Sequence, residues 1–246
     1  MARRKKNSFE GLTFLDTEVS IADHTVLDIG AWKENGSVFH GTSVAELCTF
    51  LDDTKWLCGH NLLRHDLPYL SGGTDFPQFQ GIIDTLFLSP LLFPKRPYHA
   101  LLKDDKLQTE ERNNPVNDCL KARDLLYDEL NAFHSLPARR KRIFASLLRM
   151  LPEFEGFFSF LGLKASTEDP EEIIAAEYRG KLCEHAPLDS LIRQYPAELA
   201  YALALIGTDD PFSVTPPWLI HAYPAIGNVI HLLRNKPCEE NCSYCR

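Results

Sequence analysis

The stretch TFLDTEVS, residues 13–20, places two acids one residue apart at the end of an apolar run. The apolar letters before the acids predict a β-strand over residues 12–17. Because side chains alternate between the two faces of a strand, Asp16 and Glu18 share a face and lie about 6 to 7 Å apart along it. Two carboxylates at this spacing repel each other unless a cation lies between them. On this stretch alone, a strand that runs out into a solvated turn is the simpler explanation.

The composition is that of a globular chain. With 246 residues, 44% of them hydrophobic, it is long enough for one large domain, or for one of ordinary size with a helical appendage. The net charge of −8 argues against a protein coated in basic surface for nucleic acid, although local basic clusters occur. No apolar run approaches a membrane span, and the basic tail at residues 1–8 has no apolar core behind it. We therefore expect neither a membrane protein nor a secretory signal.

Strands and helices alternate in the first half of the chain. A meander of three strands, followed by strands separated by helices, predicts a mixed sheet covered by helices. Asn35-Gly36 is a strong signal for a tight hairpin turn, and Ser43 with Glu46 three residues later is a helix-capping pattern. The expected strands cover residues 12–17, 25–33, 36–41, 55–60 and the start of 81–93, and the expected helices cover 42–53, 61–70 as far as Pro68, the end of 81–93, and 114–133.

The pattern changes after about residue 136, where apolar residues recur at helical spacing and no clear strand follows. This change predicts a boundary near residues 135–140 and an all-helical C-terminal region. The expected organisation is a basic tail over 1–8, an α/β domain over 9–135, a helical region over 136–237 and a cysteine-rich segment over 238–246.

Two further acids occupy informative places. Asp66 follows the strand at 55–60 by one to two helical turns, near the C-terminal end of that strand, where ligands bind in open α/β sheets. Asp118 lies in the first turn of the helix at 114–133, where the helix dipole favours negative charge. Taken singly, Asp66 is explained as an acid on the surface of a helix, and Asp118 as an acid that interacts with the helix dipole.

In combination, these acids resemble the DEDD exonucleases, the DnaQ-like branch of the ribonuclease H-like fold. The resemblance covers residues 9–135 and consists of an Asp-x-Glu closing the first strand, a Gly-His-Asn-x4-Asp after the fourth, and an Asp opening the last helix. The strings IIDTLFLSPLLFPKRPYHALLKDDKL and NNPVNDCLKARDLL are similar to the exonuclease-like domain at the N-terminus of some large RecQ-family helicases. The resemblance implies a mixed five-stranded sheet with flanking helices, 3′–5′ exonuclease activity on DNA, and covalent linkage to helicase domains in a longer protein.

The resemblance also implies a two-metal site. Asp16, Glu18 and Asp118 would hold one Mg²⁺ or Mn²⁺, and Asp16 would bridge to a second ion held by Asp66 directly or through water. Hard cations prefer such oxygen ligands, and none of the four positions offers sulfur or imidazole. Ions about 4 Å apart can clamp the attacking water and the leaving 3′-oxygen of an in-line displacement.

Three other residues are candidates for contacts with the substrate, for which a single-stranded 3′ end is the expected form. Thr17, between the two acids of the first strand, would contact the terminal nucleotide. Asn61 corresponds to the family's motif asparagine, with a capping residue for the following helix as the alternative. Lys103 would contact phosphate, with a solvated loop as the alternative.

The sequence departs from the family just before the last acid. Active members usually carry a His five residues, or a Tyr four residues, before that Asp, and Asn113 and Asn114 stand there instead. An amide cannot accept a proton at neutral pH and can only orient water. Either Asn113 positions the attacking water in a working nuclease, or the domain has lost much of its rate. A further hypothesis is that His99 replaces the missing base. A general base typically contributes about a hundred- to ten-thousandfold, so its loss need not abolish activity. Because all four acids are present, we expect a working nuclease that is slow.

Three alternatives to a DNA nuclease stay open. The same fold can serve as a catalytically weak module that binds DNA ends, or as an exonuclease for short RNA, since nothing in the sequence visibly reads a 2′-hydroxyl. The most remote alternative is a helical interaction protein in which the acids are incidental.

The last nine residues, CEENCSYCR, contain Cys238, Cys242 and Cys245 at the spacing C-x3-C-x2-C. Thiols this close together are usually metal ligands, but three are too few for a closed tetrahedral zinc site. We expect a Zn²⁺ site whose fourth ligand comes from residues that follow in a longer protein, with free thiols as the alternative. The other cysteines have apolar neighbours and indicate buried or half-buried free thiols in a reducing compartment such as the cytosol; they are Cys48, Cys58, Cys119 and Cys183.

Overall fold

The computed structural model describes residues 9–20, 22–72, 76–96, 99, 101, 114–164, 167–208, 215–236, 238 and 240–245. The described residues form two compact units that alternate along the sequence. The first unit takes its residues from Met1–Phe87, Ala100–Asp128 and Glu155–Phe160, and the second from Leu88–His99, Glu129–Phe154 and Leu161–Arg246.

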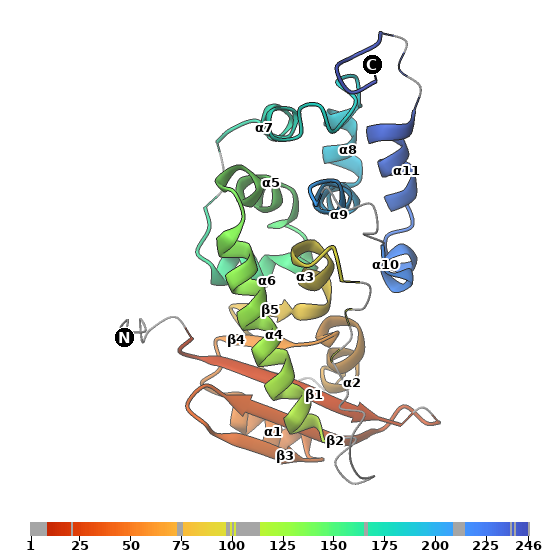
Figure 1. Ribbon diagram of the computed structural model, residues 1–246. Coiled ribbons are helices and arrows are strands. Elements are labelled where there is room, and N and C mark those ends of the chain that lie inside the picture. Colours follow the sequence, from red (N-terminus) through yellow and green to blue (C-terminus); the bar gives the residue numbers. More distant parts are fainter. Residues whose placement is uncertain are drawn as a thin grey trace. The chain divides into compact units, whose positions relative to one another are not determined.

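A five-stranded sheet forms the centre of the first unit, in the order β3-β2-β1-β4-β5 (Figure 1). The strands are β1 (Leu12–Val19), β2 (Val26–Lys33), β3 (Val38–Gly41), β4 (Trp56–Gly59) and β5 (Gly81–Asp84). β2 pairs antiparallel with β1 and β3, whereas β4 pairs parallel with β1 and β5. The sheet and its helices confirm the predicted α/β class and are consistent with a ribonuclease H-like fold.

Both acids of the opening motif lie inside β1, which is longer than the predicted strand. The sequence pattern ended the strand at residue 17, but the ladder with β2 continues past that point and pairs Asp16 with Gly30 and Glu18 with Asp28. The extra residues are strand because β2 provides hydrogen-bonding partners for their backbone groups.

The helices that belong wholly or partly to the first unit follow the strands in the predicted order. They are α1 (Val44–Leu51), the π-helical turn η1 (Leu62–Asp66), α2 (Leu67–Leu70), α3 (Thr85–Leu92), α4 (Pro115–Ser135) and the end of α6 (Pro152–Phe160). Ser43 caps α1, because its side chain accepts a hydrogen bond from the Glu46 N–H at 3.3 Å. The predicted helix at 61–70 is two short turns, and Pro68 lies in the first turn of α2, where a missing N–H costs no hydrogen bond.

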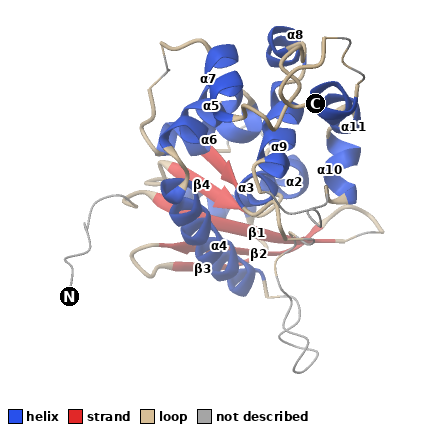
Figure 2. Cartoon of the chain, turned by 45° about the horizontal axis from the view of Figure 1, so that its top comes forward, coloured by secondary structure: helices blue, strands red, loops and turns tan. Residues whose placement is uncertain are grey.

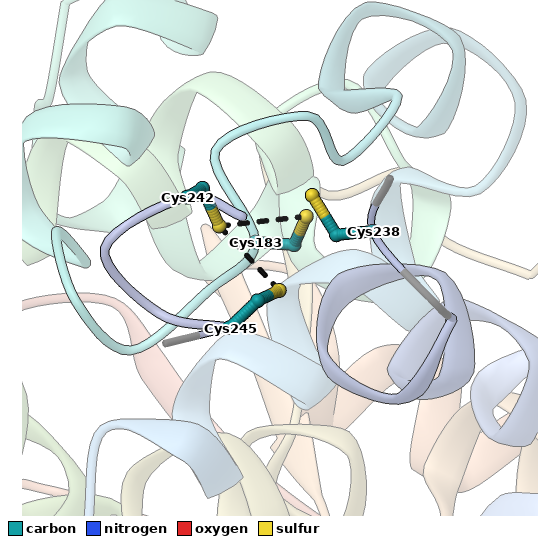
Figure 3. A group of neighbouring side chains, drawn as sticks. All are labelled: Cys183, Cys238, Cys242 and Cys245. Atoms are coloured by element: carbon teal, nitrogen blue, oxygen red, sulfur yellow. Dashed lines mark hydrogen bonds between the residues drawn. The ribbon is translucent and has the colours of Figure 1, made fainter. Parts of the chain in front are cut away.

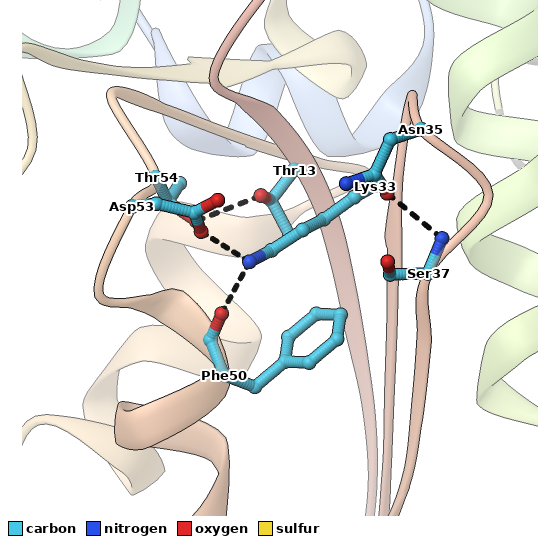
Figure 4. Close-up of polar contacts among 7 residues, drawn as sticks. All are labelled: Thr13, Lys33, Asn35, Ser37, Phe50, Asp53 and Thr54. Carbon is cyan, nitrogen blue, oxygen red and sulfur yellow. Dashed lines mark hydrogen bonds and ion pairs between the residues drawn. The ribbon is translucent and has the colours of Figure 1, made fainter.

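One face of the sheet is covered by α1, η1 and α2, which together bury a leucine-rich core; its members are Leu15, Ile29, Ala31, Leu47, Leu51, Leu57, Leu62 and Leu70. Polar bonds fasten α1 to this face at its C-terminal end (Figure 4). The Lys33 ammonium donates to the carbonyl of Phe50 and pairs with Asp53, while the hydroxyls of Thr13 and Thr54 are 2.8 Å apart. The opposite face is crossed by α4 (Figures 1 and 2).

The second unit is helical in its described part, which confirms the predicted helical C-terminal region. After the part of α3 and α4 that it includes, its helices are α5 (Ala138–Leu148), α7 (Pro170–Glu177), α8 (Leu188–Gln194), α9 (Pro196–Ile206), α10 (Pro217–Ala222), α11 (Ile226–Ile230) and the π-helical turn η2 (His231–Asn235). Helix α9 is buried on nearly every side and is contacted by α5, α8 and α11. Among the described residues, every helix is too short or too polar to cross a membrane.

Candidate metal centres

Three carboxylates meet on the face of the sheet that α4 crosses. Asp16, Glu18 and Asp118 each direct a carboxylate oxygen to one place, where the three oxygens lie within 4.8 Å of one another. The first two come from the central strand β1 and share a face through strand alternation, as predicted. The third comes from the first turn of α4. All three side chains are half-buried, so they remain accessible from solvent.

A glycine allows α4 to bring its acid to the sheet. Gly30 pairs with Asp16 across the β1–β2 ladder. A Cβ on Gly30 would lie 2.4 Å from the backbone nitrogen of Val116 and 2.5 Å from the carbonyl carbon of Pro115. No other residue would tolerate this approach, because real Cβ atoms do not come within 3 Å of backbone atoms. The N-terminus of α4 therefore rests directly on β2, beside Asp16.

Asn114 begins this helix. Its side-chain oxygen accepts a hydrogen bond from the N–H of Val116 at 3.0 Å, so the amide caps α4. The amide of Asn114, four residues before Asp118, thus has a structural use. Asn113 and Lys103, predicted to position water and to contact phosphate, lie outside the described residues.

The fourth predicted acid, Asp66, is attached to the residue between the two acids of β1. Its side chain is almost wholly buried. The backbone N–H and the hydroxyl of Thr17 both donate to Oδ1 of Asp66, at 2.8 and 2.7 Å. Asp66 is therefore separate from the group of three carboxylates but adjacent to it. Both donors of Thr17 are used in this contact, and its predicted contact with a nucleotide stays a prediction.

The turn that carries Asp66 is organised by Asp84, which is not among the site residues predicted from the sequence. The fully buried Asp84 carboxylate accepts hydrogen bonds from the backbone N–H groups of Asn61 (2.8 Å), Leu63 (3.0 Å) and Leu86 (3.0 Å). Burial raises the pKa of Asp84 to about 6 despite these donors. A signal for this residue was present, because Asp84 ends β5, a parallel neighbour of β4, at the edge of the sheet where Asp66 was expected.

Asn61 opens the same turn in the left-handed backbone conformation, with φ of 65°. It occupies the N-cap position of η1, as the alternative expected, but its side chain makes no capping hydrogen bond. Asparagine adopts this conformation more readily than most residues, which explains its presence between Gly59 and η1.

The negative charges of the site change the pKa values of neighbouring side chains and form ion pairs with basic residues. Burial raises the pKa of the Cys119 thiol, and the charges of Asp16, Asp66 and Asp118 raise it further, as expected if they surround it. Lys121 pairs with Asp118 at 2.9 Å. The carboxylate of Asp66 raises the pKa of His65, whose Nδ1 lies 3.6 Å away. The ammonium of Lys121, and the ring of His65 when it is protonated, offset part of the repulsion within the site.

The donor set fits a hard divalent cation. All the candidate ligand atoms are carboxylate oxygens, which Mg²⁺ and Mn²⁺ prefer. Two ligands of one Mg²⁺ stand about 2.9 to 4.2 Å apart, from a metal–oxygen bond of 2.0–2.1 Å. The spacing within Asp16, Glu18 and Asp118 is compatible with this range after small side-chain adjustments.

The suggested substitute base, His99, belongs to the second unit. Its ring is buried, and its Nδ1 lies 2.9 Å from the hydroxyl of Ser89. Burial lowers the pKa of His99 to about 4, which makes the imidazole a poor proton acceptor at neutral pH.

A second group of potential ligands lies in the helical unit, where four cysteines gather (Figure 3). Cys183 joins the three C-terminal cysteines, and all four sulfurs lie within 4.8 Å of one another. The sequence predicts Cys183 as a separate buried thiol and the fourth ligand in residues that follow Cys245. The separation in sequence hid the relationship, because Cys183 and Cys238 are 55 positions apart. Four thiols in this arrangement can bind zinc.

Comparisons with known proteins add no relative to these observations: no protein-family model, no curated protein and no solved structure gave a significant match to the chain.

Proposed function

We propose that the first unit is a metal-dependent 3′–5′ exonuclease that acts on DNA. The observation that carries the proposal is the convergence of Asp16, Glu18 and Asp118 within 4.8 Å, with Asp66 hydrogen-bonded to the residue between the first two. Carboxylates this close to one another repel, and a bound cation would offset that repulsion. The sheet order and motif order are those expected of a DnaQ-like nuclease.

The four acids would divide the work of binding cations and substrate. Asp16, Glu18 and Asp118 would hold one Mg²⁺ or Mn²⁺, and Asp16 with Asp66 would hold a second. Bound divalent ions supply Lewis-acid activation of water and stabilisation of a leaving 3′-oxygen. Thr17 keeps Asp66 in place and Asp84 keeps its turn in place, so the carboxylates are oriented before substrate arrives.

A second function, binding of DNA ends with little hydrolysis, is favoured by one observation. The amide of Asn114, at the position where active relatives of this fold carry tyrosine, is used to cap α4 and has no basic nitrogen. Loss of a general base would lower the rate by about a hundred- to ten-thousandfold while leaving the cation site intact. Either activity suits a domain joined to a helicase that exposes single strands, the setting that the similarity to RecQ-family proteins suggests.

The test is release of nucleotides from single-stranded DNA labelled at its 3′ end, with Mg²⁺ or Mn²⁺ and with EDTA. We expect slow, metal-dependent release by the wild-type chain and a loss of roughly a hundredfold or more in Asp16→Asn and Asp118→Asn. Asp124→Asn is the matched control, because Asp124 lies on the same helix, is exposed and contacts Arg123.

Each other outcome selects a different function. If the wild-type chain and Asp16→Asn release nucleotides equally slowly, the enzyme proposal fails. Tight binding of the DNA end without release would favour the binding module. Faster release from a matched RNA oligonucleotide than from DNA would favour an exoribonuclease.

A further inference from the structure

The four-cysteine group joins two distant parts of the helical unit. Cys183 lies between α7 and α8, and the other three cysteines lie on the C-terminal segment after η2 (Figure 3). The Sγ atom of Cys242 is 3.9 Å from that of Cys183 and 3.5 Å from that of Cys245. These separations exclude a disulfide, in which the two sulfurs are about 2.05 Å apart.

The separations agree with four ligands around a single ion. A tetrahedral zinc site with Zn–S bonds of about 2.3 Å has its sulfurs about 3.8 Å apart. The two sulfur–sulfur distances at Cys242 bracket this value, and all four sulfurs are within 4.8 Å of one another. In an iron–sulfur cluster the four thiolates are divided among two or more iron atoms, and sulfurs on different irons would stand farther apart than in a mononuclear site.

Hydrogen bonds hold the two segments together next to the sulfurs. The N–H of Glu184 points to the sulfur of Cys242 at 3.5 Å, and the hydroxyl of Ser243 donates to the carboxylate of Glu184. The N–H of Cys183 donates to the carbonyl of Leu233 at 2.9 Å, which fixes the first ligand against η2. The ligands are therefore positioned by contacts that do not depend on a bound ion.

The C-terminal ligands also form a tight local turn. The N–H of Cys245 donates to the carbonyl of Cys242 at 3.1 Å, and Asn241, just before this turn, has a left-handed φ of 50°. This turn brings two ligands separated by two residues to the same side of the segment.

We propose that Cys183, Cys238, Cys242 and Cys245 form a closed, mononuclear zinc site that fastens the C-terminal segment to the loop between α7 and α8. Four protein ligands leave no open position for water or substrate, so the site is structural. Soft thiolates favour zinc, whereas the oxygen ligands of the first unit favour Mg²⁺ or Mn²⁺. The two units would therefore bind different metals.

The first experiment measures the metal content of the 246-residue chain after exhaustive dialysis against metal-free buffer. We expect about one zinc per chain in the wild-type protein and in Asp16→Asn, whose altered site takes oxygen-preferring ions. Cys183→Ser and Cys245→Ser should lose most of the zinc, and the matched control Cys48→Ser, in α1 of the first unit, should keep it. Zinc absent from the wild-type chain, or retained by Cys183→Ser, would overturn the proposal.

The second experiment needs no variant and so does not depend on how the cysteine variants fold. X-ray absorption at the zinc edge of the wild-type protein should show four sulfur neighbours at about 2.3 Å. Nitrogen or oxygen neighbours in place of any sulfur would overturn the ligand assignment. Stoichiometric iron with visible charge-transfer absorption would overturn the choice of zinc.

Discussion

Thr17 donates both its backbone N–H and its hydroxyl to one oxygen of Asp66, at 2.8 and 2.7 Å. Because Thr17 lies between Asp16 and Glu18 on β1, this contact links the turn after β4 to the strand that carries two of the candidate ligands. The carboxylate is buried, so its hydrogen bonds are not replaced by water when they are lost. The position of the fourth acid thus depends on a residue that binds no cation itself.

Replacing the hydroxyl of Thr17 tests this link. Thr17→Val keeps the shape of the side chain and removes one donor to a buried carboxylate, which should lower the free energy of unfolding by about 1–3 kcal/mol. It should also weaken binding of Mn²⁺, because Asp66 is less well held. Urea unfolding and calorimetric titration with Mn²⁺ measure the two effects. Thr17→Ser, which keeps the donor, is the control, and equal Mn²⁺ affinity in both variants would contradict the link.

The close approach of α4 to β2 predicts a strong effect at Gly30. In Gly30→Ala the new Cβ would lie 2.4 Å from the backbone nitrogen of Val116, so α4 must move away from the sheet. We expect a loss of about 1–3 kcal/mol in the free energy of unfolding and weaker Mn²⁺ binding, because Asp118 moves with the helix. Gly72→Ala is the control, since a Cβ there meets nothing within 4 Å. A crystal structure of Gly30→Ala with α4 unmoved would contradict the explanation.

Asp84 should be irreplaceable by its amide. The two carboxylate oxygens of Asp84 accept hydrogen bonds from three backbone N–H groups. Asp84→Asn replaces one of these oxygens by an NH2 group, which is a donor and would face at least one backbone N–H. We expect a loss of about 1–3 kcal/mol in stability and faster hydrogen exchange at Asn61 and Leu63, the residues whose amides it holds. Exchange at these amides is measured by NMR or mass spectrometry. Unchanged exchange there would show that the turn is held by other contacts.

The buried His99 predicts a loss of stability in acid. Its pKa is about 4 in the folded chain and 6.5 in the unfolded chain, so the unfolded state binds more protons between these values. The stability contributed by the neutral ring is complete above pH 6.5 and is lost as the pH falls toward 4, by about 1–3 kcal/mol. His99→Gln has no titrating ring at this position, so its stability lacks this dependence on pH. The free energy of unfolding of the wild type, relative to that of the variant, should therefore fall by about 1–3 kcal/mol from pH 7 to pH 4.5. A difference that does not change with pH would contradict the prediction.

Local patterns in the sequence predicted most of the elements and three of the candidate ligands. Strand alternation placed Asp16 and Glu18 on one face, and the helix-start pattern placed Asp118 in the first turn of α4, because both rules act over a few residues. The turn at Asn35-Gly36 and the cap at Ser43 were readable for the same reason. The end of β1 was not, because its last residues are strand only through pairing with β2.

Contacts between distant residues were decided by the tertiary structure. The bonds from Thr17 to Asp66 span 49 positions, and the contact between the sulfurs of Cys183 and Cys242 spans 59. Local propensities do not predict which side chains come into contact across such separations in sequence. These contacts depend on how the whole core packs, as at Gly30, where the absence of a Cβ allows α4 to approach the sheet. The sequence by itself determined which residues have the chemistry of a metal ligand, and the packing of the fold decided which of them meet.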